Sequence, residues 1–592
     1  MNTSRRKALA GAIVSTVTSL CGLGCGSNDG TASGESAVSA ERSVDFPGPK
    51  ENLQAFPTGL VSGGTPPLRT GGVPPSTGTI GTGGGTAFGA NFAEAAALSA
   101  TAPSETASTQ PGEPDTGHPP LPSLPSTGSR NAAAATFAPS AATARFRFCN
   151  PIFGPPCPFD GIVENCTGCE TGFPPDPNAA IGAGEIVQVV NSRMQVTNKV
   201  GTILCNGGVN LKHFLRTADS LTDPRILFDD VNQRFVFAIT VSNPPASAAP
   251  AMWVAASNGS DACGTWNTYR LTFNGDPFPN GTFLDFPMLG QDRDNLLIST
   301  RNCLPNKPDC FAADGANFSV FGLPKNAIYA GNHVQFNTFA VQSLTAPVIN
   351  AGQPMVASDV SHFLAAVPGT GYVLYRLTHG GGDGATITPT AIAAPFEKPS
   401  RNANQPGTSV TIDPTDGNIV AAPYFDGTSI WFAHVVNDAG FPTVKYGAVN
   451  TGSNTVVTAL AFHAFTSDDF NPSLAVAITS LGETIHLNWA FTNTAAQVAT
   501  SDVVRSFAVN ALSPQLANLV GGGDVYASGA ITNGQGSGNG APARFGDFSS
   551  VSIDPANANC AVATQEYFGT DGNWRTRIAP IGDCASLVFK PL

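Results

Sequence analysis

The stretch Arg544-Phe-Gly-Asp-Phe-Ser-Ser-Val-Ser-Ile-Asp554 contains an acidic residue, Asp547, that opens a short apolar-alternating run, and a second, Asp554, that closes it seven positions later. The same frame occurs upstream as Asp285-Phe-Pro-Met-Leu-Gly-Gln-Asp292 and as Asp223-Pro-Arg-Ile-Leu-Phe-Asp-Asp230, and a looser copy begins at Asp176. Copies that begin at Gln353 and Gln405 keep the closing Asp and replace the opening one. A strand that begins and ends alike at intervals of roughly fifty to sixty residues indicates a radial repeat.

Strand patterns continue through the chain after residue 173. β-branched and apolar residues alternate between Gly, Asn, Asp and Pro, as in Ile186-Val-Gln-Val-Val190 and Leu474-Ala-Val-Ala-Ile478. Long segments with helical periodicity are missing after residue 150. Grouping the strands gives seven modules that begin near residues 174, 222, 281, 351, 402, 454 and 541. The sequence therefore predicts an all-β fold, a single β-propeller over residues 173–592 with seven blades, or six if the first group is only a closing strand.

The first 25 residues have the features of an export signal. Ser4-Arg5-Arg6-Lys7 is basic, and residues 8–20 are apolar but too short to cross a bilayer. The arginine pair resembles a twin-arginine signal, with ordinary Sec export as the alternative. Gly22-Leu-Gly-Cys25 resembles the lipobox of bacterial lipoproteins, which implies lipidation of Cys25; the alternative is a soluble secreted protein.

Residues 26–143 are mostly Gly, Pro, Ser, Thr and Ala, and such a composition predicts a disordered tether between an anchor and the folded module. We expect a lipoprotein of the outer membrane or cell surface, or a secreted protein. A formal net charge of −13 argues against a nucleic-acid partner. The only membrane contact we expect is the lipid anchor, and we expect a monomer.

Twelve cysteines in an exported chain favour disulfide bonds. Residues 144–172 form a Cys-rich loop segment, where Cys166-Thr-Gly-Cys169 also allows a zinc knuckle or a redox dithiol. Elsewhere, we expect Cys303 and Cys310 to close a short turn-rich loop, and Cys560 and Cys584 to tie the strands of the last blade. The candidate disulfide cysteines are Cys149, Cys157, Cys166, Cys169, Cys303, Cys310, Cys560 and Cys584.

Two hairpin sequences carry a family resemblance. Gly264-Thr-Trp266 and Gly572-Asn-Trp574 each follow an Asp, at Asp261 and Asp571, and resemble the Asp-box hairpins of sialidase-type propellers. Together with the opening Pro174-Pro-Asp-Pro-Asn-Ala-Ala-Ile-Gly182, the chain resembles a group of exported bacterial propeller proteins that are mostly uncharacterised. The resemblance implies the fold and says little about function.

The opening acids are the candidate site. In a propeller they would gather at one mouth of the central channel, and four carboxylates in an arc would bind Ca²⁺ or a polar ligand, or act as an acid/base pair. The alternative is that each Asp accepts hydrogen bonds from backbone N–H groups where blades meet. The four residues are Asp176, Asp223, Asp285 and Asp547.

Two functions follow from this arrangement. We expect a surface binding or interaction module for an extracellular carbohydrate or protein. The alternative is a carbohydrate-active enzyme, a glycoside hydrolase or lyase, that uses two carboxylates at the channel mouth, with Glu397 and Glu566 as further candidates. The sequence contains no motif that identifies a catalytic residue, so an enzyme is the less favoured of the two.

Overall fold

The computed structural model describes residues 79, 81–101, 157–164, 174–275, 278–305, 310, 316–350, 360–479, 482–509, 516–532 and 542–584. Within these residues, β-strands dominate and helices are short. None of the described helices is long and apolar enough to cross a membrane.

Strands that follow one another in the chain pair antiparallel, as expected where short turns connect them. In the described residues they form groups of four, which we number modules 1 to 7. Module 1 is β4 (Asn178–Ile181), β5 (Glu185–Val190), β6 (Arg193–Asn198) and β7 (Val209–Asn210); module 2 is β8 (Leu221–Asp229), β9 (Arg234–Val241), β10 (Ala251–Ser257) and β11 (Thr265–Asn274); module 3 is β12 (Phe283–Gln291), β13 (Asn295–Cys303), β14 (Ala316–Pro324) and β15 (Val334–Val341).

The remaining modules continue in chain order. Module 4 is β16 (Ala346–Pro347), β18 (Val360–Val367), β19 (Gly371–Thr378) and β20 (Ile387–Ala393); module 5 is β23 (Tyr424–Phe425), β24 (Ser429–Asp438), β25 (Phe441–Asn450) and β26 (Thr455–Phe462); module 6 is β27 (Asp468–Thr479), β28 (Gly482–Asn493), β29 (Val498–Val509) and β31 (Asp524–Ser528); module 7 is β32 (Ser550–Asp554), β33 (Asn557–Phe568), β34 (Trp574–Gly582) and β3 (Phe159–Val163). Shorter elements between them are α3 (Leu211–Leu215), α4 (Lys325–Ala330), η1 (His379–Gly381), β17 (Ile349–Asn350), β21 (Ala403–Asn404), β22 (Thr411–Ile412) and β30 (Leu519–Val520).

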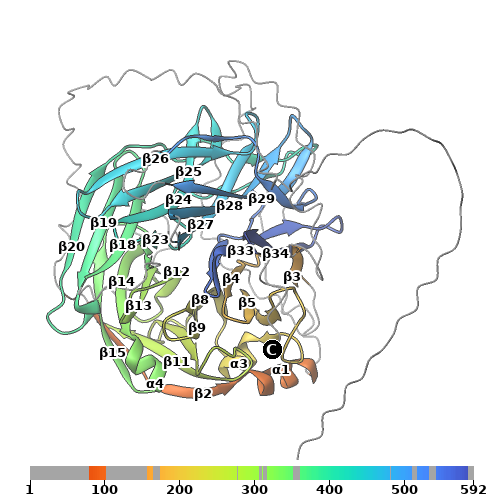
Figure 1. Cartoon of the computed structure of the whole chain (residues 1–592). Helices are drawn as coiled ribbons and strands as arrows, with labels where there is room; N and C mark the ends of the chain where they lie inside the picture. The colour runs from red at the N-terminus through yellow and green to blue at the C-terminus, as the bar shows by residue number, and fades with distance from the viewer. Residues whose placement is uncertain are drawn as a thin grey trace, which may run out of the picture. The chain divides into compact units, whose positions relative to one another are not determined.

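The first strands of the modules meet around an axis. β4 contacts β8, β8 contacts β12, β12 contacts β16, β27 contacts β32, and β32 returns to β4. Figure 1 shows the modules following one another around this axis in chain order. The fold is an all-β propeller, as the sequence predicts. The number of blades stays a prediction, because β17 pairs with both β12 and β23 and joins modules 3 and 5 in one sheet.

The last module is closed by a strand from the N-terminal side of the chain. β3 pairs antiparallel with β34, so residues 159–163 lie in the same sheet as residues 574–582. The sequence predicts loops over 144–172, and this prediction is wrong for β3. Its short Gly-containing sequence, Phe-Asp-Gly-Ile-Val, shows little alternation, and only the partner strand makes it regular.

A second correction concerns the tether predicted over residues 26–143. Within it, β1 (Gly81–Gly85), β2 (Ala87–Asn91) and α1 (Phe92–Thr101) form a segment, residues 81–101, that we call the strap. β1 pairs with β11 of module 2 and with β15 of module 3, and thereby joins their outer edges. A Cβ on Gly83 would lie 2.3 Å from the Phe336 ring, so glycine is what allows this strand to approach.

Three disulfides join described cysteines. Cys303–Cys310 and Cys560–Cys584 confirm two predicted pairs, whereas Cys205–Cys263 was not predicted. Cys157 is also disulfide-bonded. The other cysteines named as candidates, Cys25, Cys149, Cys166 and Cys169, lie outside the described residues.

Candidate functional site

The residues that open the innermost strands share a positive φ angle, and the repeat frame predicted from the sequence identifies only some of them. Asp176, Asp223, Phe286 and Asn471 have φ between 48° and 61°, and a proline follows each of them. In β8, β12 and β27 this position lies in a β-bulge. The module 3 equivalent of Asp223 is therefore Phe286, and the predicted frame, which used Asp285, was one residue out of register.

Two of the four predicted acids hold neighbouring modules together. Asp176 Oδ1 accepts a hydrogen bond from the backbone N–H of Asp547 at 2.7 Å, across the junction of modules 1 and 7. Asp223 Oδ2 accepts one from the N–H of Phe286 at 3.0 Å, across the junction of modules 2 and 3. Both side chains are fully buried. The prediction that the acids bind a ligand is thus corrected for these two residues. They accept backbone N–H groups between modules, as the alternative prediction has it.

The other two acids have arginine partners. Asp285 Oδ2 lies 3.3 Å from Arg301, and Asp547 lies 3.0 Å from Arg544, which stands three positions before it. Asp285 is buried, and its Oδ1 has no hydrogen-bond partner. All four carboxylates interact electrostatically within one cluster, so the structure does bring them together. Asp176, Asp223 and Asp285 are buried, and Asp547 is half-buried.

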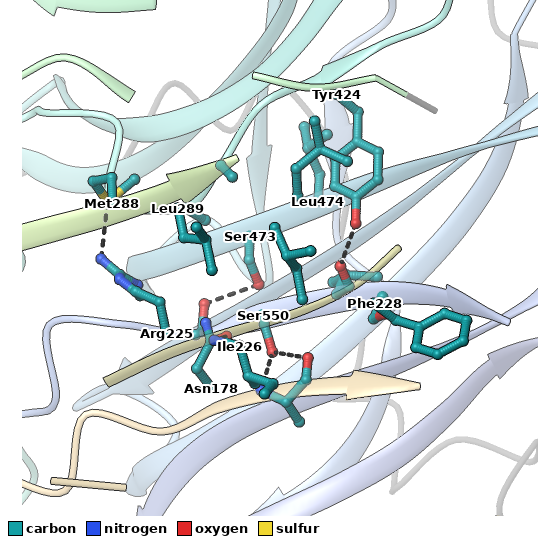
Figure 2. Close-up of a pocket in the computed structure, with 18 of the residues that line it drawn as sticks. Asn178, Arg225, Ile226, Phe228, Met288, Leu289, Tyr424, Ser473, Leu474 and Ser550 are labelled. Carbon is teal, nitrogen blue, oxygen red and sulfur yellow. Dashed lines mark hydrogen bonds between the residues drawn. The ribbon is translucent and has the colours of Figure 1, made fainter. Parts of the chain in front are cut away.

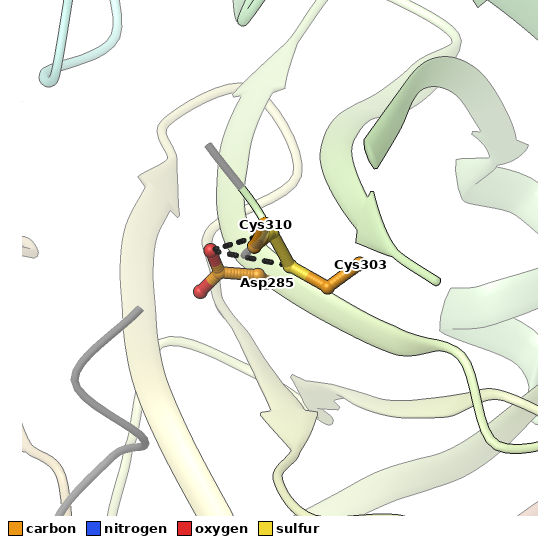
Figure 3. Close-up of side chains that lie close together, drawn as sticks. All are labelled: Asp285, Cys303 and Cys310. Atoms are coloured by element: carbon orange, nitrogen blue, oxygen red, sulfur yellow. Dashed lines mark hydrogen bonds between the residues drawn. A yellow bond between two sulfur atoms is a disulfide. The ribbon is translucent and has the colours of Figure 1, made fainter. Parts of the chain in front are cut away.

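The four predicted acids do not bring three carboxylate oxygens close together in the part of the chain that the structure describes. Among the described residues, three potential ligand atoms come within 4.8 Å of one another only at Asp285, Cys303 and Cys310 and at Glu185, Asp261 and Cys263. Figure 3 shows the first group, in which Asp285 Oδ2 lies 3.7 and 4.0 Å from the two sulfurs. Both sulfurs belong to the Cys303–Cys310 disulfide, carry no hydrogen and are not thiolate ligands.

The two further candidate glutamates, Glu566 and Glu397, have different surroundings. Glu566 is buried, and its Oε2 accepts a hydrogen bond from the Gly546 N–H at 2.6 Å. Burial raises the pKa of Glu566 well above its ordinary value. Glu397 is exposed and accepts a hydrogen bond from Asn437 at 3.0 Å. The structure does not bring these two carboxyl groups together as an acid/base pair.

Arg225 closes the channel on the side of the acidic cluster, which we call the narrow end. Its Nε donates to the Pro287 carbonyl at 2.8 Å, and its guanidinium carbon lies 3.1 Å from the centre of the Phe548 ring. Burial lowers the pKa of Arg225 to about 9, and the nearby carboxylates of Asp223 and Asp176 oppose that shift. Arg225 at the narrow end is therefore packed against Phe548 and its charge is compensated by nearby carboxylates.

Burial and neighbouring negative charge also change the pKa of an acid at the narrow end. The pKa of Asp176 is raised to about 7, chiefly by burial and then by the charge of Asp547, while Arg544 opposes the shift. A carboxyl group that is neutral below pH 7 reduces the repulsion within the cluster.

Beyond Arg225 the axis contains a central cavity of about 70 Å³. Figure 2 shows Arg225 and Met288 at one end of it and Tyr424 and Phe228 at the other, with Ser473 and Ser550 between them. The Arg225 Nη2 atom lies 2.8 Å from Met288 Sδ, and the Tyr424 hydroxyl donates to the Val551 carbonyl at 3.0 Å. Serine hydroxyls and backbone groups give this cavity polar surface beside apolar side chains such as Ile226 and Leu474.

The central cavity continues into a larger one, which we call the mouth cavity, with a volume of about 290 Å³. The two share Phe228, Gln291, Ile349, Tyr424 and Ser552, so they are parts of one channel. The mouth cavity is further lined by Asp230, Asn350, Val476, Ala477, Ile478, Ile553, Asp554, Pro555 and Ala558.

The lining of the mouth cavity combines polar and apolar groups. Asp230 is exposed, and its charge, after burial, contributes to the raised pKa of Tyr424. Asn350 contributes an amide, and Phe228 and Pro555 contribute apolar surface. None of the described lining residues is a lysine or an arginine. The cavity therefore favours an uncharged or cationic ligand with hydroxyl groups over an anion.

Acidic residues lie at the turns that follow the first strands of five modules, and one of them, Asp554, lines the mouth cavity. We call these residues the rim acids: Glu185, Asp229, Asp292, Asp426 and Asp554. In the four aspartates, Oδ1 accepts backbone N–H groups two or three positions later, which fixes the hairpin turn. The closing Asp of the repeat is thus a turn residue.

Sequence reasoning missed Asp230, Asn350 and Tyr424 as site residues. The signal for Asp230 was present, because Asp229-Asp230 doubles the closing acid in module 2 alone among the quoted copies. Asp229 fixes the turn, and the second acid lines the mouth cavity. Asn350 and Tyr424 carried no signal, because they lie on the two-residue strands β17 and β23.

Comparison with known proteins gives distant similarities. No family model and no curated protein matches the chain. A Trypanosoma rangeli sialidase in complex with sialic acid aligns over 69% of this chain at 13% identity with a TM-score of 0.36, and the alignment spans 61% of the sialidase. A GH43_1 enzyme from Xanthomonas citri aligns over 58% of this chain and 90% of its own at 12% identity, with a TM-score of 0.28. An exo-β-1,3-galactanase from Phanerochaete chrysosporium aligns over 59% of this chain and 93% of its own at 10% identity, with a TM-score of 0.26. Similarities at this level carry no information about what this chain binds or does.

Proposed function

We propose that the chain is a binding module that takes an uncharged, hydroxyl-rich ligand, a carbohydrate, into the mouth cavity. The observation that carries the proposal is the lining: one exposed carboxylate at Asp230, an amide at Asn350, an aromatic wall at Phe228 and Tyr424, and no cationic side chain. Carboxylates and amides hydrogen-bond sugar hydroxyls, and the apolar wall covers the C–H face of a sugar ring. A cavity of about 290 Å³ lies at the lower limit of typical small-ligand sites.

Hydrolysis of the same ligand is the second candidate. The observation in its favour is that two carboxylates, Asp230 and Asp554, line the mouth cavity. Asp554, however, is fully buried, and both of its oxygens accept from Lys199 Nζ at 2.7 and 2.9 Å. A carboxylate held in this way is not placed to attack a sugar or to donate a proton. Binding without turnover is therefore the better supported of the two.

We further propose that the module is exported and held at a membrane by lipid on Cys25. The support is the sequence alone, because the signal-like residues 1–25 lie outside the described part of the chain. Disulfides in the propeller fit an oxidising compartment. Substitution Cys25→Ala should move the protein from the membrane fraction to the soluble fraction; an unchanged distribution would contradict the anchor.

The binding proposal is tested with the purified full-length protein on an array of neutral and acidic glycans. We expect binding to neutral glycans, and we expect Asp230→Asn and Asn350→Ala to weaken it by about tenfold each, the effect of one lost hydrogen bond to a charged or amide group. Asp383→Asn, an exposed acid outside the mouth cavity, is the matched control. Selective binding to acidic glycans, or wild-type affinity in Asp230→Asn, would overturn the proposal. Release of a free sugar in the same samples would favour the enzyme.

A further inference from the structure

The strap joins the outer edges of two modules into one continuous sheet face. β1 lies between β11 of module 2 and β15 of module 3 and pairs antiparallel with both. Its register with the two neighbours places polar residues and glycine in rows across the three strands. Two of these rows are Asn274–Thr82–Asn337 and Thr272–Gly84–Gln335. The positions between them on the outer two strands, such as Leu271 and Phe336, are buried between the modules.

A hollow of about 620 Å³ lies on this face, and we call it the strap hollow. Its floor is β1, and the outward side chains of β11 and β15 stand on either side. At one end Thr86 Oγ1 lies 3.3 Å from His333 Nδ1. On the side of module 4, Asn337 Nδ2 donates to the carbonyls of Gly381 and Gly382 at 3.1 and 3.4 Å, which fixes the η1 turn as a border of the hollow.

Gly84 gives the hollow its depth. In the row Thr272–Gly84–Gln335 the middle position has no side chain, and a Cβ there would lie 2.9 Å from the Val334 carbonyl oxygen. The side chains of the two outer strands therefore stand above a floor of main chain. β1 is five residues long and spans about 13 Å, and β11 and β15 lie about 10 Å apart across it. The floor is thus long enough for a chain of several sugar rings.

The strap hollow offers hydrogen-bonding groups that the protein itself does not use. Asn274, Thr82 and Gln335 are exposed, and their side chains make no hydrogen bond within the part of the chain that the structure describes. Each amide offers a donor and an acceptor side by side, and the hydroxyl offers both in one atom. Asn274 and Gln335 stand on opposite sides of β1, so a ligand that lies along the strap meets both.

The composition of the lining selects the class of ligand. The charged side chains at the hollow are Arg270, which pairs with Asp219 at 2.9 Å, and Asp383 at its border. A nucleic acid or an acidic polymer needs cations that are not already paired. An extended peptide needs pockets for its apolar side chains, and the one aromatic residue of the described lining, Phe336, is 5% exposed. A neutral ligand with hydroxyl groups along its length fits the amides and hydroxyls that remain.

We propose that the strap hollow is a second binding site, which takes a neutral oligosaccharide of several rings along β1 through Asn274, Thr82 and Gln335. The hollow and the mouth cavity share no lining residue, so this inference does not rest on the proposed function. The site exists because of the strap. Without β1, the strands that carry Asn274 and Gln335 belong to separate modules.

The first test measures the affinity of the full-length protein for neutral glycans, from single rings to hexasaccharides. We expect affinity to rise with chain length, because a single ring covers only part of the hollow. In the double variant Asn274→Ala/Gln335→Ala we expect affinity for the best-bound hexasaccharide to fall by about a hundredfold, about tenfold for each lost amide. Gln342→Ala, an exposed glutamine just after β15 that lines neither cavity, is the matched control.

The second test locates the bound hexasaccharide by amide hydrogen exchange. We expect it to slow exchange at residues 81–86 and 333–337, because a ligand on the strap opposes local opening of these strands. The same protection should appear in Asp230→Asn, whose substitution lies at the mouth. Thr82→Trp places a bulky side chain in the hollow and removes no hydrogen bond of the described chain. We expect it to abolish the protection and to keep the melting temperature of wild type.

The two carbohydrate sites fail separately in these experiments. A hexasaccharide that protects only residues 228–230, or wild-type affinity in Asn274→Ala/Gln335→Ala, would overturn the second site and leave the mouth standing. Protection of residues 81–86 that persists in Asp230→Asn and is lost in the double variant supports the second site, even where the mouth binds nothing. Neutral hexasaccharides that do not bind at all, or acidic glycans that bind the strap more tightly, would also overturn it. If either variant lowers the melting temperature, the exchange pattern of the wild type alone decides between the two sites.

Discussion

The two ends of the channel use the same repeat frame in opposite ways. At the narrow end, three of the four opening acids are buried, all four accept backbone N–H groups or pair with arginine, and three of them, Asp176, Asp223 and Asp547, act on the charge of Arg225. At the mouth, the closing acids hold the hairpin turns and tie the modules, and a cavity remains between them. The difference between the two ends teaches that the repeated acids of this propeller join neighbouring modules. The additional acid, Asp230, lies instead at the mouth cavity.

The largest effect is expected at Arg225. Substitution Arg225→Met removes the positive charge that the Asp176, Asp223 and Asp547 carboxylates face, and leaves the buried Asp176 and Asp223 with less compensation. We expect the free energy of unfolding to fall by about 3–5 kcal/mol, measured by chemical denaturation. Arg293→Met, which breaks an exposed pair with Asp294, is the control and should change stability by less than about 0.5 kcal/mol. Similar values for the two variants would show that the narrow end is not charge-compensated.

A somewhat smaller loss is expected at the mouth from Lys199→Met. This change leaves Asp554 buried at the junction of modules 7 and 1, and we expect a loss of about 3 kcal/mol. Adding Asp554→Asn should recover part of the loss, because the uncompensated charge is then absent. A double variant as unstable as the single one would mean that packing of the lysine chain, rather than the ion pair, holds this part of the rim.

Substitutions of Asp223 at the narrow end test whether this acid accepts a backbone N–H group or binds a ligand. Asp223→Ala removes the acceptor for the Phe286 N–H, and we expect a loss of about 1–3 kcal/mol, whereas Asp223→Asn, which keeps an acceptor, should lose less than about 1 kcal/mol. The melting temperature of the wild type should be the same with Ca²⁺ and with a chelator. A melting temperature that rises with Ca²⁺ would restore the cation site that the sequence suggested.

The smallest effect on stability is expected at Asp230, where the effect on binding is expected to be largest. Asp230 is exposed and is not one of the rim acids, so Asp230→Asn should change the free energy of unfolding by less than about 0.5 kcal/mol. Thermal denaturation of this variant beside Asp223→Ala gives the contrast between the two ends directly. A large loss of stability would assign Asp230 to the rim structure and remove it from the ligand site.

The amino-acid sequence determined what depends on residues close together in the chain. Alternating apolar residues and Asp turns determined the strands and hairpins, and thus the all-β propeller. Cys303–Cys310 and Cys560–Cys584, whose partners are 7 and 24 positions apart, were identified correctly because the first pair closes a short loop and the second lies within one module. Cys205–Cys263, 58 positions apart, was missed because nothing local connects the two cysteines.

The tertiary structure alone decided what each acid does, because those partners meet only after the ring closes. Asp176 and Asp547 are 371 positions apart, and Lys199 and Asp554 are 355 apart. For the strap, composition predicted the wrong structure, because the sequence Gly-Thr-Gly-Gly-Gly of β1 is typical of a flexible chain. The missing side chains instead allow β1 to fit between two outer strands, against the Phe336 ring. Neighbouring residues determine a turn, whereas the charges around a buried carboxylate depend on which distant strand packs against it.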